Sequence, residues 1–439
     1  MGSYVPTTAA EREQMLAQVG VKSLNDLYAA VPQEMFLHNG LNLPEGLSEL
    51  EVREKVTDLA EKNKVFKTVL RGAGSYRHFI PAVVKSITSR EELVTCYTPY
   101  QAEISQGVLQ GTFEFQTMIC ELTGMDVANA SHYDGATAAA ETIPMCKERK
   151  RNVAYVSETT NPQVIEVMKT YCFASNTELH VVPAKDGKTD AEALKAALGD
   201  NAACFYVQQP NFFGQIEDTV ALGEITHAAG AKFVMGVNPI ACALLPTPRE
   251  VGADVAVGDG QPLGLDTAFG GPYLGFMATT SAMTRKLPGR IVGETKDVDG
   301  KTGYVLTLSA REQHIRREKA SSNICSNQAL CAFTAGVYMS AMGEDGMKQC
   351  ARLCTSKAHY LASELEKIGC KLKYTGEFFH EFVTETACPN CRKKILDALA
   401  EKNILGGAEV DGGILWCVTE LVSKEKLDEV VAIVKEVQG

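Results

Sequence analysis

A glycine-rich stretch between two short apolar runs constrains this chain more than any other segment. Residues 252–278 read GADVAVGDGQPLGLDTAFGGPYLGFMA, with apolar runs at Asp254–Val257 and Tyr273–Ala278. Each run predicts a strand. The glycines between them permit turns with positive φ and a close approach of the backbone to a ligand or another chain. No lysine occurs between Lys232 and Lys286, so the stretch has no amine that could form an imine with a carbonyl compound.

Strands and helices alternate through residues 65–330. Short apolar runs predict strands, and the segments between them have the caps and periodicity of helices. This alternation predicts an α/β fold with a large, doubly wound, mostly parallel sheet. The predicted strands are Val153–Val156, Leu179–Val182, Ala203–Val207 and Lys232–Gly236, and the predicted helices include Pro162–Tyr171, Ala191–Leu198 and Ala221–Ala229.

The segments on either side of this region have a different character. Residues 1–64 predict an N-terminal helical arm, in which Thr7 or Thr8 caps one helix and Ser48 caps another, with Glu51 completing a capping box. The arm either packs on the larger domain or helps a dimer to form. Residues 331–439 predict a small C-terminal α+β domain. Its predicted helices are Leu330–Met342, Gly346–Lys367, Cys391–Glu401 and Lys424–Val437, and its predicted strands are Cys370–Tyr374, Glu381–Thr384 and Ile414–Thr419.

Composition excludes several classes of protein. The chain has 439 residues and a net charge of −11, which argues against nucleic acid and anionic membranes as partners. No apolar run approaches the roughly 20 residues that span a bilayer, and the first residues lack the pattern of a secretory signal. The 14 cysteines lie mostly in apolar patterns, as expected in a reducing compartment. We therefore expect a cytoplasmic enzyme or enzyme subunit.

One polar stretch predicts a substrate pocket. Residues 95–107 read TCYTPYQAEISQG and combine phenols, hydroxyls, amides and one carboxylate around a proline. Such groups need polar partners when they are buried, so the alternative is a helix-capping loop that satisfies its own side chains. The residues predicted to line the pocket are Tyr97, Thr98, Tyr100, Gln101 and Glu103, together with His78, which is either an exposed polar residue or part of the site.

Two further segments are candidates for contact with an anion or a partner. Residues 125–141 read MDVANASHYDGATAAAE and predict a helix whose N-terminus faces an anion or is simply capped. The segment 306–330 carries a basic block. This block is either a solvated helix face or a surface for an anion or a protein partner. The residues predicted for such a surface are Arg311, Arg316, Arg317 and Asn323.

A single Cys-X-X-Cys motif, Cys388 to Cys391, precedes a predicted helix. Neither a thioredoxin-like βαβ unit nor a second such motif accompanies it. We therefore predict no metal site and no redox role from this motif.

The glycine-rich stretch resembles the lysine loop of pyridoxal 5'-phosphate (PLP) enzymes of fold type I, the aspartate-aminotransferase fold. In that family a Schiff-base lysine lies between the two strands, and an Asp at the end of a neighbouring strand holds the pyridine nitrogen. The resemblance places Gln261, or Pro262 with a shift of one residue, at the lysine position, and Gly236 at the Asp position. Two cofactor contacts are therefore absent, and we predict that this chain does not hold PLP.

Longer segments carry a more specific resemblance, which covers nearly the whole chain. They are YTPYQAEISQG, FEFQTM, ANASHYDGATAAAE, GDGQPLGL, FGGPYLGF and REQHIRREKASSNICSNQAL. Together they resemble the glycine-cleavage P-protein family, the glycine decarboxylases. The match is to the N-terminal half of that protein, which is a separate alpha subunit in many bacteria.

The resemblance implies a division of labour between two subunits. A homologous beta subunit would carry the lysine and PLP, the two subunits would form an α2β2 heterotetramer, and the site would lie at their interface. Glycine would be decarboxylated and its aminomethyl group passed to the lipoyl arm of H-protein, so this chain would be inactive alone. Two alternatives remain open: a noncatalytic scaffold that stabilises the beta subunit, and a PLP enzyme that acts alone with an unconventional lysine.

Overall fold

The computed structural model describes residues 6–37, 40–320, 322–386 and 389–438, which fall into two compact units, Met1–Lys64 and Val65–Gly439. The described residues of the first unit form two α-helices, α1 (Ala9–Val19) and α2 (Glu49–Ala60), and two short 3-10 helices. Thr8 and Glu11 form a capping box on α1, and Ser48 and Glu51 form one on α2. Neither helix buries a side chain, so local capping rather than core packing defines where each helix begins.

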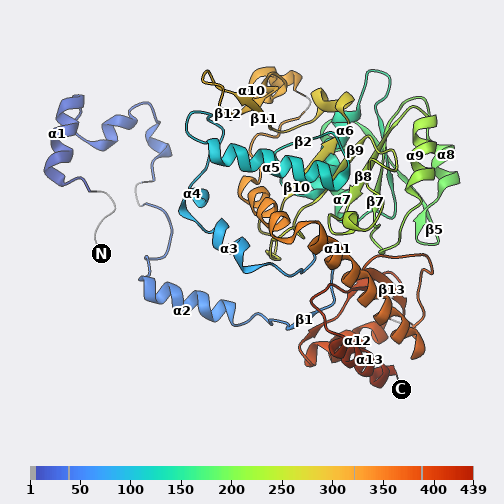
Figure 1. Ribbon diagram of the computed structural model, residues 1–439. Helices are drawn as coiled ribbons and strands as arrows, with labels where there is room; N and C mark the ends of the chain where they lie inside the picture. The colour runs from blue at the N-terminus through green and yellow to red at the C-terminus, as the bar shows by residue number, and fades with distance from the viewer. Residues whose placement is uncertain (1–5, 38–39, 321, 387–388, 439) are drawn as a thin grey trace. The chain divides into compact units, whose positions relative to one another are not determined.

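The second unit is built on a seven-stranded sheet in the order β2-β10-β9-β8-β7-β3-β4 (Figure 1). The five strands from β9 to β4 are parallel to their neighbours, whereas β10 runs antiparallel to both β9 and β2. The predicted α/β fold with a mostly parallel sheet is therefore confirmed. The strands are β2 (Val127–Ala128), β3 (Val153–Ser157), β4 (Glu178–Val182), β7 (Ala202–Gln209), β8 (Lys232–Val237), β9 (Val255–Asp259) and β10 (Gly275–Thr279).

Helices bury both faces of this sheet. Along β8, Phe233 and Met235 join one hydrophobic cluster and Val234 joins the other, because successive side chains of a strand point to opposite faces. A parallel sheet covered on both faces explains why its strands read as continuous apolar runs. One face is covered by α3 (Ala82–Thr88), α5 (Gln106–Thr123), α8 (Ala191–Ala197), α9 (Thr219–Ala228) and the first half of α11 (Ala329–Lys367); the other is covered by α6 (Gly135–Cys146) and α7 (Pro162–Ala174).

The C-terminal residues form a second, smaller core. Its three-stranded antiparallel sheet has the order β13-β16-β15 and lies near α12, α13 and the second half of α11 (Figure 1). The parallel pair β1–β14 also contributes, and Leu70, which directly follows β1, is fully buried in this core. We propose that residues 331–439 form a small domain. Strand β1 also belongs to its core, and helix α11 contributes to this core and to that of the large sheet. Its elements are β1 (Thr68–Val69), β13 (Glu381–Glu385), α12 (Pro389–Glu401), β14 (Ile404–Leu405), β15 (Ala408–Val410), β16 (Gly413–Cys417) and α13 (Lys424–Gln438).

Helix α11 joins the two cores. Its backbone leaves helical geometry at Gly343, where φ is 61° and ψ is −179°. Two helices were predicted here, and the gap between them falls at this break. The sequence did not predict the hairpin of β11 (Ile291–Lys296) and β12 (Thr302–Thr307), and the predicted strand at 370–374 is only an isolated bridge from Leu372 to Thr384.

Smaller elements complete the second unit, namely α4 (Glu91–Val94), β5 (Ala184–Lys185), β6 (Lys188–Thr189) and α10 (Gln313–Arg316). Among the described residues, no helix is both long and apolar enough to cross a membrane.

Gly214 tests how tightly the two cores meet. It has a φ of +81°, and a methyl group there would overlap the backbone carbonyl of Glu381 on β13. Gly300 has a φ of +80° but faces open space. We expect Gly300→Ala to lower the free energy of unfolding by about 1 kcal/mol through backbone strain alone. Gly214→Ala should lower it by about 3 kcal/mol, because overpacking adds to the same strain. If chemical denaturation shows that the two variants lose the same free energy of unfolding, the close contact between Gly214 and Glu381 is contradicted.

Candidate functional site

A cavity of about 380 Å³ opens at the carboxyl ends of the parallel strands. In open α/β sheets, ligands bind at this edge. Its walls come from the ends of β7, β8 and β9, the N-termini of α6 and α7, the loop 73–76, and His380 and Glu381 at the start of β13. The cavity is therefore the candidate functional site, and both cores contribute to it.

The N-terminus of α6 is already occupied by two carboxylates of the chain. Asp134 caps the helix by accepting the backbone N–H of Thr137 at 2.7 Å. Asp259, at the end of β9, accepts the backbone N–H of Gly135 at 2.9 Å and that of Gln261 at 2.9 Å. Burial raises the pKa of Asp259 to about 7. These carboxylates take two of the N–H groups that could hold a phosphate, and in their ionised form they would repel one.

Tyr206 fills the space above Gly236. The two residues lie on the neighbouring strands β7 and β8, and a methyl group at Gly236 would overlap the phenol hydroxyl of Tyr206. Tyr206 is only 3% exposed. An Asp at position 236 would therefore need this ring to move.

Gln261 points away from the cavity. Its side-chain oxygen accepts the backbone N–H of Tyr76 at 2.8 Å, and its side-chain nitrogen donates to the carbonyls of Tyr76 and Leu265 at 2.7 and 2.8 Å. Pro262 lines the cavity instead. Of the two positions considered for the lysine, only Pro262 faces the site, and neither residue has an amine.

The residues around the cavity do not fit PLP. None of the described residues that line it is a lysine. The helix terminus that would bind a phosphate is capped by carboxylates, and Gly236 offers no carboxylate to a pyridine nitrogen. We therefore derive no chemistry from a cofactor held by this chain.

A second buried carboxyl group lies across the cavity, on β13. Glu381 accepts the hydroxyl of Tyr76 at 2.8 Å and the backbone N–H of Ala73 at 2.7 Å. Burial raises the pKa of Glu381 to about 7, despite these two hydrogen bonds. Next to it, burial lowers the pKa of His380 to about 3, so its ring is neutral. The cavity wall thus carries groups that can exchange a proton or hydrogen bond with a ligand near neutral pH.

Sequence reasoning missed these cavity residues for different reasons. Asp259 had a signal, because it is the polar residue that ends an apolar strand at the glycine-rich turn. Tyr206, His380 and Glu381 had none, because they lie within ordinary apolar patterns and reach the cavity only through the tertiary fold.

The residues of the predicted substrate pocket do not line this cavity. Tyr97 is 89% exposed, and Thr98, Gln101 and Glu103 are exposed as well. Tyr100 is half-buried; its hydroxyl donates to Asn327 at 2.9 Å, and its ring lies 4.2 Å from the guanidinium of Arg290. A pocket formed by these residues would need a second chain, so their role remains a prediction.

The basic block divides into an internal residue and an exposed surface. Arg311 is half-buried and donates to the backbone carbonyls of Leu287 and Gly289, so it holds the chain together. Arg316, Arg317 and Asn323 are exposed. Of the four residues predicted for this surface, these three are therefore available to an anion or a partner. Cys388 of the Cys-X-X-Cys motif lies outside the described residues.

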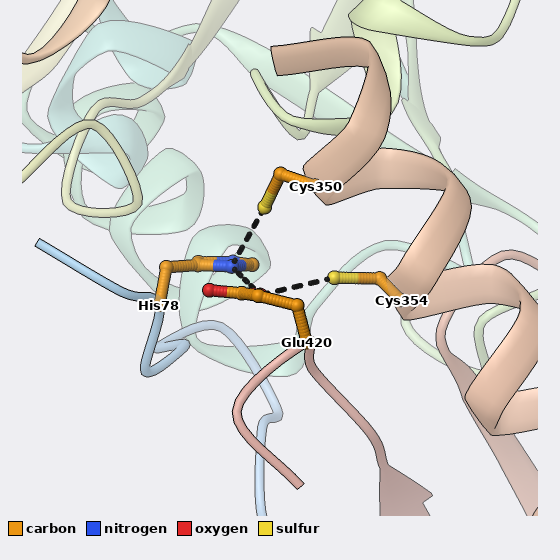
Figure 2. A group of neighbouring side chains, drawn as sticks. All are labelled: His78, Cys350, Cys354 and Glu420. Atoms are coloured by element: carbon orange, nitrogen blue, oxygen red, sulfur yellow. Dashed lines mark hydrogen bonds and ion pairs between the residues drawn. The ribbon is translucent and has the colours of Figure 1, made fainter. Parts of the chain in front are cut away.

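His78 lies in a separate, buried cluster rather than beside the Tyr97 stretch. Its Nδ1 lies 2.8 Å from Glu420 Oε2 and 3.6 Å from the sulfur of Cys350, and the sulfur of Cys354 lies 3.3 Å from Glu420 Oε2 (Figure 2). Burial would lower the pKa of His78, but hydrogen bonds to Cys350 and Glu420 raise it to about 9. No local pattern in the sequence indicates that these four residues meet.

The raised pKa of Glu381 predicts a pH dependence of stability. Between pH 4.5, the ordinary pKa of the group, and about pH 7, Glu381 keeps its proton in the folded state but loses it in the unfolded state. The free energy of unfolding therefore falls as the pH rises through this window. Glu381→Gln should remove about 3 kcal/mol of this fall. Urea unfolding at several pH values would measure it.

Glu385→Gln is the matched control, because Glu385 lies at the exposed end of the same strand. It should leave the pH dependence as it is in the wild type. An unchanged pH slope in Glu381→Gln would show that the buried carboxyl does not titrate in this window.

Comparison with known proteins places the chain in a family. Residues 2–434 match the family model described as glycine cleavage system P-protein. A probable glycine dehydrogenase (decarboxylating) subunit 1 from Desulfitobacterium hafniense is 48% identical, over 99% of this chain and 100% of that protein. A crystal structure of glycine decarboxylase (P-protein) of the glycine cleavage system, in inhibitor-bound form, has a TM-score of 0.92 and 40% identity, over 99% of this chain and 100% of that one.

A more distant structure shares the fold alone. An alanine–glyoxylate aminotransferase from Nostoc sp. has a TM-score of 0.61 at 14% identity, over 93% of this chain and 99% of that one. The predicted fold type I architecture is therefore confirmed. Both the family match and the full-length similarity extend across the two cores that form the cavity, and the chain belongs to the glycine cleavage system P-protein family.

Proposed function

We propose that this chain is the alpha subunit of a glycine decarboxylase and that its catalytic PLP is held by a homologous beta subunit. The observation that carries this proposal is the cavity itself. It lies where the fold binds ligands, yet its own Asp134 and Asp259 cap the helix terminus and no lysine among the described residues lines it. A chain that keeps this fold without a cofactor is best explained as one half of a shared enzyme.

The family supports the identity of the partners. The Desulfitobacterium relative carries "subunit 1" in its name, which supports a second subunit here. We propose an α2β2 heterotetramer in the cytoplasm, acting on glycine and passing the aminomethyl group to the lipoyl arm of H-protein. PLP on the beta subunit would supply the electron sink for decarboxylation.

This chain would contribute walls and recognition surfaces to that enzyme. Tyr97, Thr98, Gln101 and Glu103 are exposed and would line a pocket completed by the partner subunit. A tyrosine can pack along an alkyl arm while its hydroxyl finds a polar partner. The exposed Arg316 and Arg317 would face the beta subunit or an acidic carrier protein, because local positive charge steers encounters in a chain of net charge −11.

Two alternatives make different demands on the chain. A scaffold that only stabilises the beta subunit needs no pocket residues from this chain. A PLP enzyme acting alone needs a lysine in the cavity, and the described lining residues include none. The first is tested by substitutions in the assembled enzyme and the second by the chain alone.

The isolated chain should form no stoichiometric PLP adduct at a single site. After incubation with one equivalent of PLP and reduction with borohydride, peptide mapping should find only scattered, substoichiometric labelling of surface lysines, because none of the described residues that line the cavity has an amine that could form an imine. Gln261→Lys should remain inactive on glycine as well. Residue 261 faces Tyr76 rather than the cavity, and the helix terminus is still capped by Asp134 and Asp259.

A lysine-bearing homologue from the same genome, treated in parallel, is the positive control for this experiment. A stoichiometric borohydride-trapped adduct on the wild-type chain would favour the enzyme that acts alone.

In the assembled complex, Tyr97→Ala should slow catalysis without destabilising this chain. We expect exchange of labelled bicarbonate into glycine, with H-protein present, to fall at least about tenfold, or about 1.4 kcal/mol of transition-state stabilisation. The thermal stability of the isolated chain should hardly change, because this side chain is 89% exposed.

Phe173→Ala is the matched control, because Phe173 is an equally exposed aromatic residue on α7. It should leave exchange unchanged. Near-normal exchange in Tyr97→Ala, or a loss that only follows failed assembly, would favour the scaffold.

A further inference from the structure

Four side chains with metal-binding atoms meet in the interior, away from the cavity described above. Cys350 and Cys354 lie on successive turns of α11, His78 lies in the loop before α3, and Glu420 follows β16. Figure 2 shows the four side chains pointing toward one another from these three segments. One ligand atom from each lies within 4.8 Å of every other. Positions far apart in the sequence thus converge on one point.

The ligand types and spacings are those of a zinc site. Zinc is bound by Cys, His and carboxylate ligands at about 2.0–2.3 Å, and in structural sites four protein ligands hold it tetrahedrally. Tetrahedral geometry at those lengths separates ligand atoms by about 3.3–3.8 Å. The contacts of Cys350 with His78, at 3.6 Å, and of Cys354 with Glu420, at 3.3 Å, already have such separations. The contact of His78 with Glu420, at 2.8 Å, would have to open slightly.

Helix geometry argues against a disulfide as the purpose of the two cysteines. Residues four apart on a helix have Cβ atoms about 5–6 Å apart. A disulfide needs about 3.5–4.5 Å. Closing the bond would distort α11 at a point where both cysteines are buried, with exposed fractions of 3% and 0%. A shared metal ion needs no such distortion, because it lies between the two sulfur atoms.

The surroundings orient the ligands. The second oxygen of Glu420, Oε1, accepts the backbone N–H of Phe79 at 2.5 Å, which directs Oε2 into the cluster. The backbone carbonyl of Glu420 accepts from the side chain of Lys357, one turn beyond Cys354 on the same helix. Such outer contacts fix the orientation of metal ligands. A metal ion would have only a short path from solvent to the cluster, because Arg77 and Phe79, on either side of His78, are exposed.

We propose that His78, Cys350, Cys354 and Glu420 bind one zinc ion as a structural site. With four protein ligands the coordination is closed, so the ion would crosslink rather than catalyse. It would join the loop 77–81, helix α11 and the C-terminal core. The same loop continues from the cavity residues 73–76, so the ion would also brace one wall of the candidate site. This inference goes beyond the proposed function and does not depend on it.

Metal content of the full-length chain tests the proposal directly. The chain is produced without a histidine tag in zinc-supplemented medium, passed through a desalting column and analysed by mass spectrometry of the elements. We expect about one zinc per chain. Replacement with Co²⁺ should give the visible absorption of a tetrahedral site and a thiolate-to-metal band. Added zinc should also raise the melting temperature of the metal-free chain.

Variants separate the site from adventitious binding. Cys350→Ser/Cys354→Ser should lose the zinc and the thiolate band. Glu420→Gln keeps the volume of the side chain and should weaken zinc binding at least about tenfold while leaving the thiolate band at saturating Co²⁺. Cys146→Ser/Cys172→Ser is the matched control, because it removes two buried helical cysteines elsewhere in the chain and should retain the zinc.

Two results would overturn the proposal. The first is a wild-type chain that takes up neither zinc nor Co²⁺ with a thiolate band, which would leave the cluster as a hydrogen-bonded network. The second is a thiolate band that persists in Cys350→Ser/Cys354→Ser, which would place the metal on other cysteines. If the double variant does not fold, Glu420→Gln still decides: an unchanged zinc affinity in that variant removes Glu420 from the site.

Discussion

The paired hydrogen bonds between the side chain of Gln261 and the backbone of Tyr76 hold the candidate site together. One amide group satisfies both the N–H and the carbonyl of the same residue, which fixes the position and the direction of that backbone. Tyr76 then reaches Glu381 across the cavity. The glycine-rich turn, the cavity loop and the small domain are thus linked through Gln261, Tyr76 and Glu381. A buried amide with all its contacts satisfied is also costly to replace, because any shorter or apolar side chain would leave backbone groups without partners.

The carboxylates in the cavity show how the chain itself stabilises the helix N-terminus at the candidate site. A helix N-terminus carries unpaired N–H groups and a partial positive charge, which require either an anion or a cap. Asp134 and Asp259 meet this need from within the chain. The hydroxyl of Tyr206 likewise occupies the space beside Gly236. Several residues, rather than one, therefore distinguish this cavity from the cofactor contacts described for fold type I.

Much of the fold could be predicted from the sequence, whereas most of the site could not. The parallel strands were visible as apolar runs because both faces of the sheet are buried, and even the break in α11 lay between two predicted helices. The hairpin β11–β12 was missed because its strands are partly exposed and bear no strong pattern. The site depends on contacts between distant residues, such as Tyr76 with Glu381 or His78 with Cys350, and local patterns carry no information about them. The sequence shows that Gln261 lacks an amine, but only the structure shows that its side chain points toward Tyr76 and away from the cavity.

The pairing of β1 with β14 has a consequence for how the chain is made. Arg71, just after β1, also donates to the backbone carbonyl of Gly407, 336 residues further along the chain. On the ribosome, residues 68–71 emerge long before their partners exist, and the loop to be closed spans 336 residues. Closing such a loop is slow, since contacts that are distant in sequence form late. The small core is therefore expected to be completed only after its last strand has been synthesised, and until then Leu70, which is buried in the folded chain, is exposed to chaperones and to aggregation.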